Sequence, residues 1–182
     1  MVLGDSLTAG YGLEPEAAFP AQLQQALQGL GYTVRVINAG VSGDTSAGGL
    51  ARLDWALADR PQLVMIELGA NDALRGLPPE QTRQNLDAII TRLKQAQIAV
   101  LLTGMRAPRN FGPDYYTKFD AIYPELADRH QIAFYPFFLQ GVATIPAYNQ
   151  VDGLHPNPVG VKRIVQGVLP TLIPLLKALS NP

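Results

Sequence analysis

A serine, a histidine and an aspartate stand at positions that suit nucleophilic catalysis. Ser6 ends the tripeptide Gly4–Ser6 after a short apolar run, and His155 follows Asp152 by three residues. A serine hydroxyl is a weak nucleophile and needs a base within hydrogen-bond reach. In a tight loop the carboxylate can hold one ring nitrogen, so that the other nitrogen faces the serine. Taken singly, Ser6 could cap a helix and Asp152 could belong to a surface turn. Together, Ser6, Asp152 and His155 are our candidate catalytic triad.

Two further residues could stabilise an oxyanion, which needs two or three donors aimed at one point. Asn71 follows the apolar run Leu63–Leu68, and its side-chain amide would emerge at the carboxyl end of that strand. Gly43 follows the preceding strand and could offer a backbone N–H at a helix N-terminus. Each could be an ordinary turn residue when considered alone. Because they follow strands of one parallel sheet, we expect Ser6, Gly43 and Asn71 at the same edge.

Other chemistries have less support in the sequence. His130 lies near the end of a predicted helix, where we expect it to face solvent or interact with the helix end. The aspartates lack the histidine spacing of a metal site, so we expect neither metal nor cofactor. There is no G-x-G-x-x-G or P-loop motif, no G-x-S-x-G elbow and no cysteine.

Composition restricts the class of protein. The 182 residues fit one domain, residues 1–182, and 47% of them are apolar, which suffices for a full core. With 14 basic against 15 acidic residues, we expect no nucleic-acid partner. No apolar stretch approaches the ~20 residues of a membrane span, so we expect no membrane insertion. The first strand looks short, and we suspect that an upstream segment is absent.

Alternating β-rich runs and helical patterns predict an α/β fold with a parallel sheet. Apolar residues at helical spacing indicate helices around residues 19–30, 50–57, 86–93 and 119–126, and a last helix from Pro158 that Pro170 and Pro174 bend or shorten. The second of these could be capped by Asp44, Thr45 or Ser46. The predicted strands are Met1–Leu3, Thr33–Asn38, Leu63–Leu68, Ile98–Thr103 and Ala133–Pro136.

Two long connections follow the later strands, residues 105–116 and 137–155. Ligands of open α/β sheets bind at the carboxyl ends of strands, where such loops lie. The first loop could form the wall of an acyl or aryl pocket, or its rings could simply pack the loop down. The candidate substrate-binding residues are Leu74, Met105, Pro108, Phe111 and Tyr115.

Four segments in this order resemble the SGNH hydrolases, also called the GDSL esterase/lipase family. The similarity is greatest to the bacterial branch of thioesterases, lysophospholipases and arylesterases. The segments are Gly4–Leu7, Asn38–Ser46, Glu67–Asp72 and Asp152–Pro156, and the resemblance extends over essentially the whole chain. Position 70 is alanine where close relatives often have glycine. The resemblance implies a flavodoxin-like three-layer α/β/α sandwich with a five-stranded parallel sheet.

The same resemblance implies the roles of individual residues. Ser6 would be the nucleophile, His155 the base and Asp152 its orienting carboxylate, while the Ser6 N–H, the Gly43 N–H and the Asn71 amide would bind the oxyanion. We expect a small-molecule ester or thioester as substrate, with short or medium acyl chains or aryl groups. The alternatives are a carbohydrate O-acetylesterase of the same superfamily and a non-catalytic binding module. Since relatives are commonly exported, we expect a periplasmic or secreted protein; its oligomeric state stays open.

Overall fold

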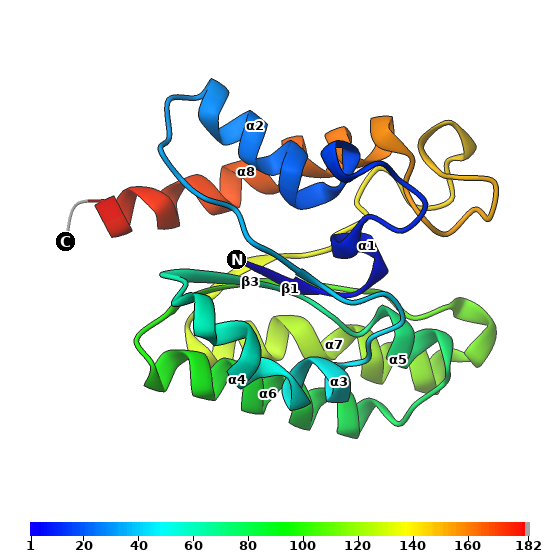
Figure 1. Cartoon of the computed structure of the whole chain (residues 1–182). Coiled ribbons are helices and arrows are strands. Elements are labelled where there is room, and N and C mark those ends of the chain that lie inside the picture. The colour runs from blue at the N-terminus through cyan, green and yellow to red at the C-terminus, as the bar shows by residue number, and fades with distance from the viewer. Residues whose placement is uncertain (181–182) are drawn as a thin grey trace.

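A five-stranded parallel sheet forms the centre of the protein, whose computed structural model describes residues 1–180 (Figure 1). The strands run in the order β2-β1-β3-β4-β5, and every neighbouring pair is parallel. This is the flavodoxin-like order, so the predicted fold class is confirmed. The strands are β1 (Val2–Gly4), β2 (Asn38–Gly40), β3 (Leu63–Glu67), β4 (Ala99–Thr103) and β5 (Ala133–Tyr135).

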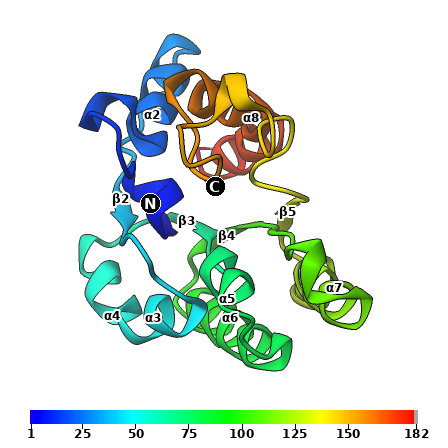
Figure 2. The same ribbon diagram turned by 90° about the vertical axis from the view of Figure 1, so that its right-hand side faces the viewer.

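Helices cover both faces of the sheet (Figures 1 and 2). On one face lie α2 (Phe19–Gly29) and α8 (Pro158–Ser180). On the other lie α3 (Ser46–Ala51), α4 (Leu53–Ala56), α6 (Pro79–Gln95) and α7 (Pro113–His130). Two short helices, α1 (Ser6–Ala9) and α5 (Ala70–Leu74), begin at the carboxyl edge directly after β1 and β3. Single 3₁₀ turns η1 to η4 occupy Pro15–Ala17, Leu57–Asp59, Arg109–Phe111 and Pro146–Tyr148.

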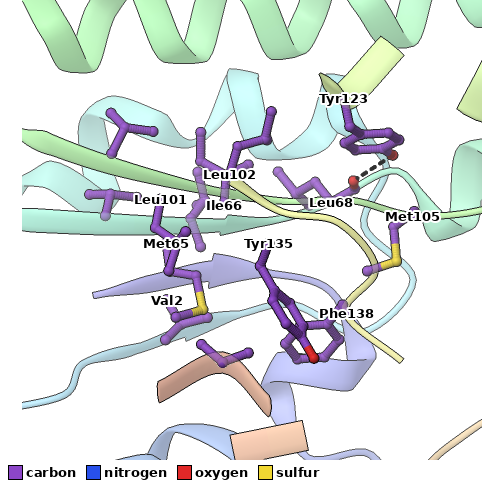
Figure 3. Packing of buried hydrophobic residues seen from close by; sticks show 14 of the residues in the cluster. Val2, Met65, Ile66, Leu68, Leu101, Leu102, Met105, Tyr123, Tyr135 and Phe138 are labelled. Atoms are coloured by element: carbon purple, nitrogen blue, oxygen red, sulfur yellow. Dashed lines mark hydrogen bonds between the residues drawn. The ribbon is translucent and has the colours of Figure 1, made fainter. Parts of the chain in front are cut away.

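The core lies where both faces of the central strands meet helices. Every residue of β3 is buried, as expected for a strand covered on both sides. The helical spacing of Leu86, Ile89, Ile90 and Leu93 is confirmed, because all four are buried on α6. Figure 3 shows Tyr123 of α7 reaching into this core, where its hydroxyl donates to the Leu68 carbonyl at 3.0 Å. The contact secures the end of β3 close to the start of α5, the helix that contains Asn71.

The predicted strand Thr33–Asn38 is wrong except for its last residue. Strand β2 starts at Asn38, which pairs with Val2, and residues 33–37 lie outside the strand, although the Ile37 carbonyl accepts the Val2 N–H at 2.9 Å. The predicted helix over residues 50–57 consists of α3, α4 and η2, and α3 is capped by Thr45, one of the three candidate caps.

Helix α8 continues through both of its prolines to Ser180, so of the two predicted effects, bending or shortening, the shortening is wrong. An interior proline removes a helical hydrogen bond, but packing of an apolar face can sustain the helix. Within the described residues, Pro158–Leu179 is the one helix that is long and apolar enough, by length and composition, to cross a membrane. Here its stripe is part of the core: Val161, Ile164, Val165, Val168 and Leu172.

Candidate active site

Three segments from distant parts of the chain meet at the carboxyl edge of the sheet. The register pairs Gly4 with Glu67, so β1 and β3 end side by side. Ser6 therefore begins α1 next to α5, in which Asn71 is the second residue. The order of strands reverses between β1 and β3, which is the point where open α/β sheets bind ligands.

Ser6, His155 and Asp152 form a continuous hydrogen-bonded line. The Ser6 Oγ lies 2.9 Å from Nε2 of His155, and Nδ1 of the same ring lies 2.6 Å from Oδ2 of Asp152. The other carboxylate oxygen of Asp152 accepts the backbone N–H groups of His155 and Leu154 at 3.0 and 2.9 Å. These bonds, first that from the His155 N–H and then that from its ring, lower the pKa of Asp152 to about 2. The carboxylate is therefore ionised at neutral pH.

Two residues that the sequence analysis did not identify hold the histidine in place. The Gln150 N–H donates to the His155 carbonyl at 2.7 Å, and its side-chain amide donates to the Tyr11 carbonyl at 2.8 Å. The Tyr11 ring lies against the imidazole, with centroids 4.6 Å apart. The loop after β5 is thus fastened to the segment after α1, which follows the serine. Neither residue belongs to a motif, so nothing in the sequence distinguished them.

The candidate oxyanion donors differ in how they are engaged. Among the hydrogen bonds of residues 1–180, the N–H groups of Ser6 and Gly43 have no acceptor. Gly43 has φ of +83°, a conformation that favours glycine. The Asn71 amide donates to Oδ2 of Asp5 at 3.0 Å and to the Asp44 carbonyl at 2.9 Å. The amide is therefore held at the junction of the three segments.

Buried polar groups connect the loops that carry Gly43 and Asn71. Asp72 accepts the Ser46 N–H at 2.8 Å and its hydroxyl at 2.5 Å, and it also accepts the Thr82 hydroxyl at 3.0 Å. The Arg52 guanidinium donates to Asp44 at 2.6 Å and to the Gly4 carbonyl at 3.0 Å. A charge-assisted bond of this kind is stronger than a neutral one, so the segments after β1 and β2 are joined firmly.

Gly4 is required for space and not for a sharp turn. Within residues 1–180 its φ is not among the positive values. A Cβ at this position would lie 2.1 Å from Oγ1 of Thr8 and 2.4 Å from Oε2 of Glu67. Asp5 braces the turn, because its Oδ1 accepts the Leu7 N–H at 3.0 Å as the cap of α1.

The candidate substrate-binding residues lie in different environments. Leu74 and Phe111 are exposed, whereas Met105 is only 3% exposed and belongs to the core (Figure 3). Pro108 is half-buried ahead of η3. The Tyr115 hydroxyl donates to the Leu77 carbonyl at 2.8 Å, and its ring lies 5.2 Å from that of Phe111. Tyr115 therefore packs this loop onto the segment that follows Leu74.

His130 is remote from the site, and neither of its predicted roles fits. Its ring is largely buried and lies 2.5 Å from Asp87, so it joins α7 to α6 on one face of the sheet. A cavity of about 330 Å³ lies at the opposite, amino edge of the sheet, against Met1, Leu27, Val34 and Leu63. Among residues 1–180 no group of acidic and histidine side chains could hold a metal ion.

The comparison with known families decides where the chain belongs. Residues 2–163 match the model of the GDSL-like lipase/acylhydrolase family. The chain is a member of this GDSL family. Among its relatives, the esterase TesA of Pseudomonas aeruginosa is 45% identical over 177 residues, which are 97% of this chain and 88% of the relative. The thioesterase 1/protease 1/lysophospholipase L1 of Escherichia coli K12 is 45% identical over 158 residues, which are 86% of this chain and 74% of the relative.

A solved esterase has the same architecture. The psychrotrophic esterase EstA from Pseudoalteromonas sp., in a structure inhibited by monoethylphosphonate, superposes with a TM-score of 0.91. It is 33% identical, and the match covers 97% of each chain. The family resemblance inferred from the four segments is therefore confirmed.

Proposed function

We propose that this GDSL hydrolase is a serine esterase that cleaves small carboxylic esters and thioesters through an acyl-enzyme intermediate. The observation that carries this proposal is the line from Ser6 Oγ through both nitrogens of His155 to Asp152. A nucleophile within reach of a base, with the base oriented by a third group, is the arrangement that activates serine. The names of the two curated relatives support the same activity.

Each group has a defined task in the reaction. His155 Nε2 removes the hydroxyl proton as Ser6 Oγ bonds to the carbonyl carbon, and the carbonyl oxygen becomes an oxyanion. The N–H groups of Ser6 and Gly43 and the Asn71 amide stabilise that charge. When the intermediate collapses, the alcohol or thiol leaves with the proton from His155. Water then attacks the acyl group, gives a proton to the histidine and releases the acid, and the proton returns to Ser6.

For the substrate we propose aryl esters, acyl-CoA and lysophospholipids with short or medium acyl chains. Apolar side chains on the loops and short helices of the carboxyl edge are exposed and favour an open apolar surface: Tyr11, Val41, Leu74, Phe111 and Leu154. Such a surface can bind an acyl or aryl group without enclosing a long chain. A series of p-nitrophenyl esters tests this range, and a maximum of kcat/KM at C16 or longer contradicts it. Faster turnover of acetylated xylan would indicate the carbohydrate O-acetylesterase instead.

The activity itself is tested with Ser6→Ala. We expect this variant to fold normally and to lose hydrolysis of p-nitrophenyl acetate and labelling by a fluorophosphonate. The two histidines offer a matched control, because His155→Ala should be inactive while His130→Ala, which changes a contact between α6 and α7, should keep its kcat. Undiminished turnover by Ser6→Ala would refute the proposal, and a fluorophosphonate that labels no site would favour a non-catalytic binding module. The predicted periplasmic or secreted location stays a proposal, for which fractionation of the producing cells is the test.

A further inference from the structure

A buried carboxyl group lies directly beneath the turn that carries Ser6. Glu67 ends the otherwise apolar strand β3 and is fully buried. Its Oε2 accepts the Asp5 N–H at 3.2 Å and the Thr8 hydroxyl at 2.7 Å. Its Oε1 is buried and has no hydrogen-bond partner among residues 1–180. Burying a carboxyl group costs free energy unless it is hydrogen-bonded, and here only the two hydrogen bonds to Oε2 offset that cost.

Asp5 continues this contact toward the oxyanion side of the site. It is also fully buried, between the Leu7 N–H on its Oδ1 and the Asn71 amide on its Oδ2. The path therefore runs from Glu67 to the backbone of Asp5, and from the carboxylate of Asp5 to the Asn71 amide. Neither carboxyl group belongs to the line of Ser6, His155 and Asp152.

We propose that Glu67 and Asp5 are positioning residues for the reaction of Ser6. Glu67 holds the turn that contains the Ser6 N–H, and Asp5 sets the direction of the Asn71 amide. The inference rests on the proposed esterase function and deepens it, because it assigns two buried groups to the orientation of the oxyanion donors. Neither of them contacts the reacting atoms.

The contacts of Asn71 explain why its direction must be set. Both hydrogens of its amide have acceptors, Asp5 and the Asp44 carbonyl, so its direction is set before a substrate arrives, and an oxyanion must share one of these hydrogens. A donor whose direction is already set needs little reorganisation when the charge develops. A loss of this orientation weakens the transition state more than the bound substrate, so kcat should fall while KM changes little.

The geometry provides a conservative variant for Glu67. Both of its hydrogen bonds end on one oxygen, and glutamine retains one carbonyl oxygen of the same shape. Burial, and next the nearby Asp5, raise the pKa of Glu67 well above its usual value, which favours the neutral form that glutamine resembles. Glu67→Gln should therefore keep the turn in place, whereas Glu67→Ala removes both bonds.

Asp5→Asn separates the two tasks of Asp5. The asparagine oxygen can still cap α1 through the Leu7 N–H, but its amide would face the Asn71 amide, donor against donor. If Asp5 acts through Asn71, this substitution should matter only while Asn71 is present. A double-mutant cycle with Asn71→Ala measures that dependence.

The experiment compares kcat for p-nitrophenyl acetate per active site, with sites counted by fluorophosphonate labelling carried to completion. We expect about 10- to 100-fold lower kcat for Glu67→Ala and Asp5→Asn, with KM within about threefold, because small misplacements have effects of this order. Glu67→Gln should stay within about threefold of the unmodified protein. In the Asn71→Ala background, Asp5→Asn should cost less than about threefold. Leu93→Ala is the control for lost stability, because it leaves a cavity beside α6 near the amino edge of the sheet, far from Ser6. This variant should be less stable but keep its kcat.

Three outcomes would overturn this inference. The first is an unchanged kcat per labelled site in Glu67→Ala and Asp5→Asn, and the second is an equal loss of kcat in Glu67→Gln and Glu67→Ala. The third is that Asp5→Asn lowers kcat in the Asn71→Ala background as much as it does when Asn71 is present. Each leaves the esterase assignment intact, because Ser6→Ala would still be inactive and unlabelled. If Ser6→Ala keeps its activity, the assignment itself fails.

Discussion

Asp152 provides the sharpest test of how the histidine is controlled, through the substitution Asp152→Asn. The asparagine oxygen can still accept the two backbone N–H groups that Asp152 accepts, so the loop should keep its shape. Its amide hydrogens would instead face Nδ1 of His155, which must then accept a hydrogen bond. The proton of the neutral ring moves to Nε2, and that nitrogen can no longer take the proton of Ser6.

The size of the effect follows from this change of tautomer and from the exposure of Asp152. The corresponding substitution in a serine protease, where the aspartate is buried, lowers kcat by about 10⁴. Here the Asp152 side chain is 38% exposed, so water can partly replace it, and we expect a loss of about 10²–10⁴. The exposure also means that the melting temperature should change little.

The assay is saturating p-nitrophenyl acetate, with thermal unfolding measured on the same samples. Asp152→Ala is the companion variant: it removes the loop contacts as well, so its kcat should fall at least as far as that of Asp152→Asn. A kcat for Asp152→Asn above about one third of normal would refute the reasoning, because Ser6 and His155 would then act without the carboxylate.

Three further outcomes are expected. Asn71→Ala should lower kcat by about 10²–10³, the cost of one oxyanion donor, and also lower the unfolding free energy by about 1–3 kcal/mol, as calorimetry would show. Gly4→Ala should lower that free energy by about 1–3 kcal/mol in a denaturant titration, because the added methyl overlaps Glu67, while the same substitution at the open Gly29 should not overlap any neighbour. Burial raises the pKa of Asp5 from 3.8 to about 6, so the folded state holds this proton more tightly than the unfolded state and loses stability as pH rises from about 4 to about 6. Relative to Asp5→Asn, the unfolding free energy should fall by about 3 kcal/mol over this range. Parallel curves of unfolding free energy against pH for the two proteins would contradict this expectation.

The sequence predicted the line of Ser6, His155 and Asp152 better than it predicted the residues that hold this line in place. The triad positions were recognisable because serine, aspartate and histidine each have a chemistry that few other residues share. Ser6 also stood beside a predicted strand end, and Asp152 and His155 stood three residues apart at the end of a long loop. Glu67 was visible only as a charged residue at the end of an apolar run. Tyr11 and Gln150 carried no signal, because their importance comes from the proximity of segments about 140 residues apart.

The fold shows the same division between local and distant effects. Helical spacing placed α6 correctly, since the pattern of buried residues lies within one segment. Strand β2 was misplaced because its limits depend on which residues of β1 lie beside it. The continuation of α8 past Pro170 was also not evident from the sequence. Its apolar stripe packs in the core, and this packing sustains the helix where the local propensity does not.

The proposed base, His155, and its carboxylate share one exposed loop, while the proposed nucleophile, Ser6, follows the buried strand β1. Residues 151–154 are all exposed, so little buried surface opposes a local opening of this loop. Gln150 and the ring of Tyr11 are its main attachments to the segment after Ser6. The enzyme can therefore stop working while the rest of the molecule remains folded. Its upper working temperature would then be set by the opening of this loop, and stiffening that attachment would raise the temperature limit of activity without any change in the melting point.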